Sequence, residues 1–153
     1  MADHNESQHK ILIALIAIHK ERIALYEELV RHVPGNPIEL RSALEDLIAQ
    51  ARMFKQALIE ALTGYGELSD IGNESDRPAF YETWCRQVAA IRDRPSTVQL
   101  MHIEQAMQLA YEMAQADLQD ETLGDMLQSQ RDELDYNITK LHLLIRKTTD
   151  NPE

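Results

Sequence analysis

Cysteine, glycine, proline and positive charge are all scarce in this sequence of 153 residues. The one cysteine, Cys85, cannot form a disulfide within the chain, so nothing points to an oxidising compartment. Five glycines and five prolines supply few turns for an all-β sandwich. The 15 Lys and Arg residues stand against 26 Asp and Glu residues, which gives a net charge of −11. A chain this acidic is a poor partner for nucleic acid or anionic lipid.

Long apolar segments are also missing. The longest aliphatic run covers residues 11–18, whereas a membrane-spanning helix needs about 20 residues. The acidic residues Asp3 and Glu6 precede this run and no small-residue cleavage site follows it, so it matches a signal peptide poorly. We therefore expect a soluble, cytoplasmic protein with no membrane partner, in which the run begins a buried helix.

Hydrophobic residues make up 44% of the chain, and they recur every three or four positions, which is the period of an amphipathic helix. Breaks in this pattern fall at residues 34–37, 63–77, 94–96 and 119–121, where turn-forming or helix-capping residues occur. The pattern predicts a single domain, residues 1–153, with helices at about residues 7–32, 38–62, 78–91, 97–118 and 121–147.

The four long segments are similar in length and bury their apolar stripes best as a four-helix bundle. The link between the second and third long segments is much longer than the other two links and contains the short helix 78–91. Such a link can cross the whole bundle, so that the helices on either side of it run in the same direction. The sequence therefore predicts an all-α, ferritin-like four-helix bundle with a long crossover that contains a short extra helix.

Several polar residues interrupt the apolar stripes. Glu104 lies between Leu100 and Met107 on the inner line of its helix, and a buried carboxylate must be neutralised, hydrogen-bonded or bound to a cation. Positions measured from the helix midpoints place the polar residues in two layers. The expected layers are Glu27, Gln50, Glu104 and Asn137, and then His19, Phe54, Tyr111 and Gln130.

Two interpretations of these residues stay open, and we favour the first. In the first, a buried hydrogen-bond network fixes the register of the helices; its members are His19, Tyr26, Glu27, Gln50, Glu104, Tyr111, Gln130 and Asn137. In the second, Glu27 and Glu104 bind a transition-metal ion such as iron, manganese or zinc. Di-iron bundles use Glu-x-x-His pairs on two helices, and the one such match here is Glu6-Ser7-Gln8-His9, at the start of the first helix.

The first long helix has a second apolar face beside its core stripe, formed by Ile11, Ile18, Leu25 and Leu29. The crossover segment around Trp84 can cover such a face, and so can a second copy of the chain in an isologous homodimer. We expect both kinds of cover, with the helix at residues 7–32 as the main dimer element.

The order and spacing of several residues resemble small bacterial four-helix-bundle proteins of the ferritin-like superfamily, in a branch of unassigned function. The residues that carry this resemblance are the stretch 18–27, the stretch 50–55, the stretch 80–84, Glu104, Tyr111 and Gln130. The resemblance covers residues 10–147 and implies the bundle and a stress-related setting. It matches Glu27 and Glu104 to acidic positions of the branch, Trp84 to its crossover tryptophan, and Gln50 and Gln130 to its glutamines. Where the branch has a histidine in the last helix, this chain has Asn137 or Ile138.

The expected function is that of a non-enzymatic, dimeric protein that acts as a binding or scaffold protein. The sequence has neither a glycine-rich phosphate loop nor a nucleophile-elbow motif. One alternative is a metal-binding protein with a reduced core site around Glu27 and Glu104, in which the transition-metal ion is the cofactor. The other alternative is a small-molecule-binding bundle with a pocket around Tyr26, Tyr111 and Glu104.

Overall fold

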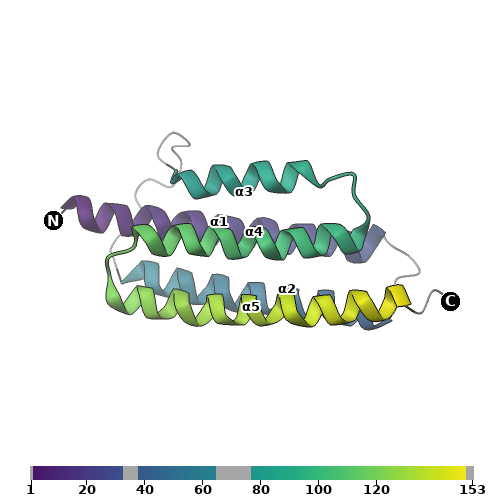
Figure 1. Ribbon diagram of the computed structural model, residues 1–153. Helices are drawn as coiled ribbons and strands as arrows, with labels where there is room; N and C mark the ends of the chain where they lie inside the picture. The colour runs from purple at the N-terminus through teal and green to yellow at the C-terminus, as the bar shows by residue number, and fades with distance from the viewer. Residues whose placement is uncertain (1, 33–37, 65–76, 151–153) are drawn as a thin grey trace.

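The computed structural model describes residues 2–32, 38–64 and 77–150, and within these ranges the chain is all-helical (Figure 1). The helices are α1 (Ala2–His32), α2 (Ile38–Thr63), α3 (Ala79–Ala90), α4 (Ser96–Asp117) and α5 (Glu121–Asp150). The all-α class is thereby confirmed. α1 begins at Ala2 rather than near Ser7, and α5 continues to Asp150. The predicted break at residues 34–37 and most of the break at 63–77 lie outside the described residues.

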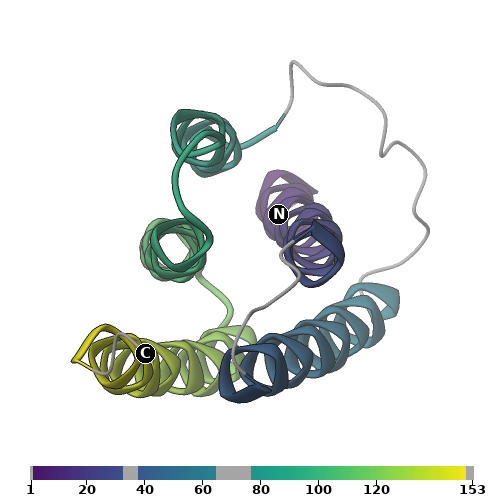
Figure 2. The same ribbon diagram turned by 90° about the vertical axis from the view of Figure 1, so that its right-hand side faces the viewer.

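Successive helices, α3 included, alternate in direction along the chain. In Figure 1, α1 and α5 run from left to right, α2 and α4 run from right to left, and α3 runs back from left to right. α1 packs chiefly against α2, whereas α4 packs against both α5 and α3. The end-on view in Figure 2 shows α2 and α5 as one layer, with α1 and α4 above them and α3 on the far side. α2 thus ends, and α3 begins, at the same end of the molecule.

The core is built from apolar side chains at helical spacing. On α2 these are Leu40, Leu44, Leu47, Ile48, Ala51, Phe54, Leu58 and Leu62. Burying one large apolar side chain contributes about 1.5–3 kcal/mol, so the shared core dominates the stability of each helix. The apolar residues remain confined to stripes, and no helix in the described part of the chain could span a membrane.

Side chains also fix where helices begin. The Asp120 carboxylate accepts a hydrogen bond from the backbone N–H of Leu123, which is an N-cap contact at the start of α5. The Gln8 side-chain oxygen accepts hydrogen bonds from the backbone N–H groups of Gln119 and Asp120. This pair of contacts ties the link between α4 and α5 to the first turns of α1.

The second apolar face of α1 is already covered within a single chain. Ile11, Ile18 and Leu29 are buried, and Leu25 is partly buried and packs against the core. α3 packs against α1 and contributes the buried side chains of Phe80 and Trp84. The predicted dimer interface on α1 is therefore wrong in its location, because its side chains have no free surface to offer. Homodimer formation itself stays a prediction.

Candidate functional site

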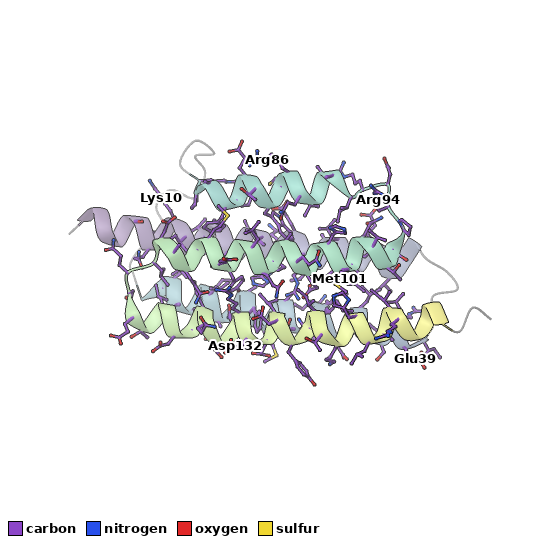
Figure 3. All side chains as sticks on the ribbon, in the orientation of Figure 1. Lys10, Glu39, Arg86, Arg94, Met101 and Asp132 are labelled. Carbon is purple, nitrogen blue, oxygen red and sulfur yellow. The ribbon has the colours of Figure 1, made fainter. Side chains whose placement is uncertain are left out.

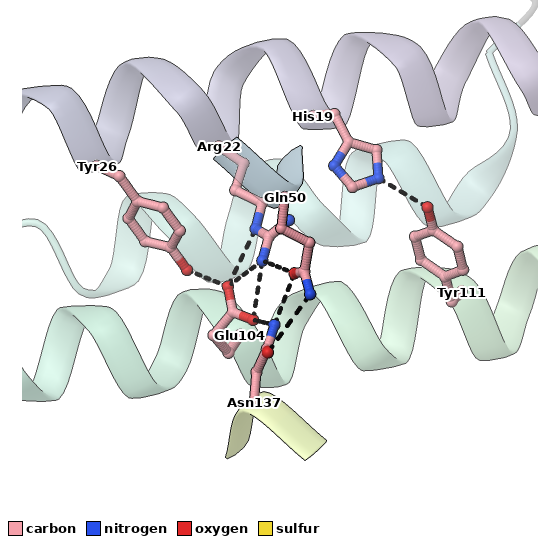
Figure 4. A network of polar contacts seen from close by, with 7 residues as sticks. All are labelled: His19, Arg22, Tyr26, Gln50, Glu104, Tyr111 and Asn137. Atoms are coloured by element: carbon pink, nitrogen blue, oxygen red, sulfur yellow. Dashed lines mark hydrogen bonds and ion pairs between the residues drawn. The ribbon is translucent and has the colours of Figure 1, made fainter. Parts of the chain in front are cut away.

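The centre of the molecule holds a buried ion pair between α1 and α4 (Figure 4). The side chains of Arg22 and Glu104 are both 0% exposed. Arg22 Nη2 lies 2.8 Å from Glu104 Oε2 and 3.0 Å from Oε1, and Arg22 Nε donates to Oε2 at 3.0 Å. The Tyr26 hydroxyl donates to Oε2, and Asn137 Nδ2 donates to Oε1 at 3.2 Å. Both oxygens of the carboxylate are therefore engaged by donors from two other helices, α1 and α5.

Two amide side chains extend the ion pair toward α2 and α5. Asn137 Nδ2 donates to Gln50 Oε1 at 2.7 Å, and Arg22 Nη2 donates to the same oxygen at 3.1 Å. We call the five residues Arg22, Tyr26, Gln50, Glu104 and Asn137 the charged layer. Its members come from α1, α2, α4 and α5. The predicted layer is thus found for Gln50, Glu104 and Asn137, with the difference that α1 supplies Arg22 and Tyr26.

Sequence reasoning missed Arg22, although a signal for it was present. Arg22 follows His19 by three residues and precedes Tyr26 by four, so all three side chains share one face of α1. Arg22 stands beside Lys20 and Glu21 in the sequence, and such a charged run usually lies on a solvent-facing side of a helix. Arginine is almost never fully buried unless it is paired. An inward glutamate on another helix is the partner that such an arginine needs.

A second layer of polar residues lies beside the first and carries no charge. The Tyr111 hydroxyl donates to Gln130 Oε1 at 2.5 Å, and His19 Nε2 lies 2.7 Å from the same hydroxyl. Because a phenol has one hydrogen to give, His19 Nε2 is the donor and Nδ1 is unprotonated. The Phe54 ring meets the imidazole edge to face at 5.7 Å. We call His19, Phe54, Tyr111 and Gln130 the neutral layer, and its members are those predicted to share a level.

Burial and the neighbouring charges hold these groups in one protonation state. Burial, together with the charges of Arg22 and Lys55, lowers the pKa of His19 well below its ordinary value. Burial also raises the pKa values of Tyr26 and Tyr111, and the Glu104 charge raises that of Tyr26 further. Burial opposes the charge on Arg22, but Glu104 and Tyr26 outweigh it and leave the Arg22 pKa raised. At neutral pH the imidazole is therefore uncharged, the phenols are donors, and the guanidinium is a cation.

Glu27 does not belong to either layer. It is exposed on the surface, where Arg52 Nη2 donates to its carboxylate at 3.0 Å. Its predicted place in the buried network is wrong, because residue 27 falls on the outer side of α1 next to the inward Tyr26. The two carboxylates predicted to share a metal ion are thus in different surroundings: Glu27 is exposed and paired with Arg52, and Glu104 is buried and paired with Arg22. Among the described residues no three His, Cys, Asp or Glu side chains gather in a way that could hold a metal ion.

Two open grooves lie on the surface rather than in the core. One, of about 490 Å³, runs between α2 and α5, and Gln50 and Asn137 of the charged layer line it. The other, of about 500 Å³, runs between α3 and α4 past Arg94 and His102. Neither groove is lined by Tyr26, Tyr111 or Glu104, whose side chains are fully buried. The predicted pocket around those three residues is therefore not part of either groove.

Comparison with known proteins finds no family model that matches the chain, and no curated protein or solved structure that matches it. The resemblance to the ferritin-like superfamily thus rests on the spacing of the chain's own residues and stays a proposal. The chemistry of the site follows from the geometry of its side chains.

Proposed function

We propose that this protein is a non-enzymatic, ferritin-like four-helix bundle that acts as a dimeric binding or scaffold protein. The directions of the helices support the ferritin-like arrangement, because α2 and α4 run the same way and α3 lies in the segment between them (Figure 1). In such a bundle α1, α2, α4 and α5 are the four main helices, and α3 is the extra helix of the crossover.

The observation that carries the proposal is the complete engagement of Glu104. The Arg22 guanidinium contacts both carboxylate oxygens, and Tyr26 and Asn137 add one donor each. A metal ion would need the same lone pairs that these donors use. The chain therefore supplies from Arg22 the positive charge that a buried glutamate requires.

The buried imidazole of His19 is poorly placed for catalysis. His19 Nδ1 has no hydrogen-bond partner, but its side chain is fully buried and lines neither groove. A general base must come within hydrogen-bond reach of a substrate, and no described groove brings one to this atom. The core polar residues therefore serve register and rigidity, and binding falls to the surface of the bundle.

Metal analysis tests this proposal against the metal-binding alternative. The protein is purified without chelator, loaded aerobically with ferrous iron, desalted and measured by elemental analysis, alongside Glu104→Gln and the matched Glu27→Gln. We expect well under one metal ion per chain in all three proteins. One or more ions per wild-type chain, lost in Glu104→Gln while circular dichroism shows an intact fold, would overturn the proposal.

A further inference from the structure

We infer that the outer face of α2 and α5 is the surface through which two copies of this chain associate. This inference rests on the proposal that the protein is dimeric, and it gives that dimer a location different from the one predicted on α1. Four large hydrophobic side chains are exposed in the described part of the chain: Ile38 (82%) and Met53 (71%) on α2, and Tyr136 (64%) and Leu143 (63%) on α5. None of the four lies on α1, α3 or α4.

Ile38 lines the groove between α2 and α5, and the other three side chains lie on the same two helices. On α5, Tyr136, Lys140 and Leu143 follow at steps of four and three, so they form one stripe along the helix. Lys140 lines the groove, and its Nζ lies 5.4 Å from the centre of the Tyr136 ring. On α2, Met53 follows Asp46 by about two helical turns and continues that wall of the groove.

The other three helices leave this face uncovered. In Figure 2, α2 and α5 form one side of the molecule, and α1, α3 and α4 all lie on the other side of that layer. Figure 3 places Glu39 at this edge and Arg86 of α3 at the opposite edge. The bottom of the groove is apolar, with Leu47 and Leu141 below the exposed rim. An open groove with an apolar floor, on a face that also exposes large hydrophobic side chains, is typical of an interaction surface.

Charge favours a second copy of the same chain as the occupant. The α2 wall of the groove carries Glu39 and Asp46, whereas the α5 wall carries Lys140. A two-fold axis parallel to the helices places α2 of each copy on α5 of the other, so that the acidic wall meets the lysine twice. The alternative axis places α2 on α2 and brings acid against acid. At a net charge of −11 the chains repel one another, so the contact needs such local pairing.

The two charges also lie at matching levels. Gln50 is hydrogen-bonded to Asn137, and α2 and α5 run in opposite directions. One turn before Gln50 on α2 is Asp46, and about one turn after Asn137 on α5 is Lys140. A two-fold axis along the helices keeps these levels, so Asp46 of one copy faces Lys140 of the other.

The face is large enough for a stable dimer. A helix of 26 residues such as α2 is about 39 Å long, and two adjacent helices are about 20 Å wide. Their outer face therefore measures roughly 800 Å², which is about what each partner buries in a standard protein–protein interface.

Sedimentation equilibrium and light scattering over a range of concentrations test the interface. We expect the wild type at twice the chain mass of 17.6 kDa. Leu143→Glu places a charge on the face and should raise the dimer dissociation constant at least about tenfold, a loss of about 1.4 kcal/mol. The matched control is His102→Glu, at an exposed position on α4, which should leave the dimer unchanged.

A charge exchange makes the test specific to the two-fold arrangement. Asp46→Lys and Lys140→Asp should each weaken the dimer, because each places like charges opposite one another. The double variant restores opposite charges and should recover most of the wild-type affinity.

The outcomes separate this inference from the proposed function. A monomeric wild type at about 1 mM, or a dimer that Leu143→Glu leaves unchanged, contradicts the inference whatever the metal analysis shows. If the double charge exchange weakens the dimer further, the two-fold arrangement is rejected. Stoichiometric metal in a protein that dimerises through this face would instead reject the proposed function and leave the interface standing.

Discussion

The charged and the neutral layers are adjacent and built from the same four helices, yet they accommodate buried polar groups differently. In the charged layer, Glu104 is compensated by a full opposite charge from Arg22. In the neutral layer, His19 is uncharged. The Tyr111 hydroxyl accepts a hydrogen bond from His19 and donates one to Gln130. Arg22 contributes to both, since its charge pairs with Glu104 and also lowers the pKa of His19. Arg22 is therefore the counter-charge of the first layer, and in the second it adds to burial, which is the main cause of the lowered His19 pKa.

The largest effect is expected from removing that cation. Arg22→Met leaves the Glu104 carboxylate buried without a counter-charge and should lower the free energy of unfolding by about 3–5 kcal/mol in urea denaturation. Adding Glu104→Leu to this variant should recover part of the loss, because no charge then stays buried alone. The matched control is Arg52→Met, which breaks the exposed pair with Glu27 and should cost about 0–1 kcal/mol. Equal losses for the two arginine variants would show that the buried pair does not support the charged layer.

A smaller effect is expected in the neutral layer. Tyr111→Phe keeps the ring but leaves the His19 Nε2–H and the Gln130 oxygen without their partner, which should cost about 1–3 kcal/mol. The comparison is with Tyr136→Phe on the surface, where the change should stay within about 0.5 kcal/mol. If both tyrosine variants unfold at the wild-type urea concentration, the hydroxyl of residue 111 makes no net contribution to stability.

The smallest expected effect is on how stability depends on pH. It tests whether His19 of the neutral layer is uncharged in the folded protein. The folded pKa of His19 is lowered below the unfolded value of about 6.5. The unfolded chain therefore binds the proton more readily, and the stability from neutral His19 is lost as the pH falls below about 6.5. His19→Gln should flatten the change in unfolding free energy between pH 7 and pH 5, whereas His102→Gln at an exposed site should not. An unchanged slope in His19→Gln would show that another group governs acid destabilisation.

Periodicity alone predicted much of the fold and part of the site. The helices begin and end close to the predicted residues, because runs of apolar residues at three- and four-residue steps end at proline or capping residues. Antiparallel helices of similar length also allow levels to be matched by counting from midpoints. That counting placed Gln50 with Asn137 and His19 with Tyr111, and both pairs are hydrogen-bonded in the structure.

The features that could not be predicted depend on contacts between helices. Arg22 and Glu27 are both charged residues of α1. Spacing puts Arg22 on the face of His19 and Tyr26, but it does not reveal whether another helix supplies the partner that a buried charge needs. The ion pair with Glu104 holds Arg22 in the core, and the ion pair with Arg52 on α2 keeps Glu27 at the surface. The cover of Ile18 likewise depends on how the rest of the chain packs against α1, which periodicity within α1 does not reveal.

The distribution of the charged layer over the chain determines which halves of the molecule can assemble. The helical hairpin of α1 and α2 carries Arg22 and Gln50, and the hairpin of α4 and α5 carries Glu104 and Asn137. Two copies of the first hairpin would bury two guanidinium groups with no carboxylate, and two copies of the second would bury two carboxylates with no cation. Each wrong pairing costs several kcal/mol, whereas the correct one pairs every charge. The Arg22–Glu104 ion pair thus favours packing of the α1–α2 hairpin against the α4–α5 hairpin and disfavours packing of either hairpin against a second copy of itself.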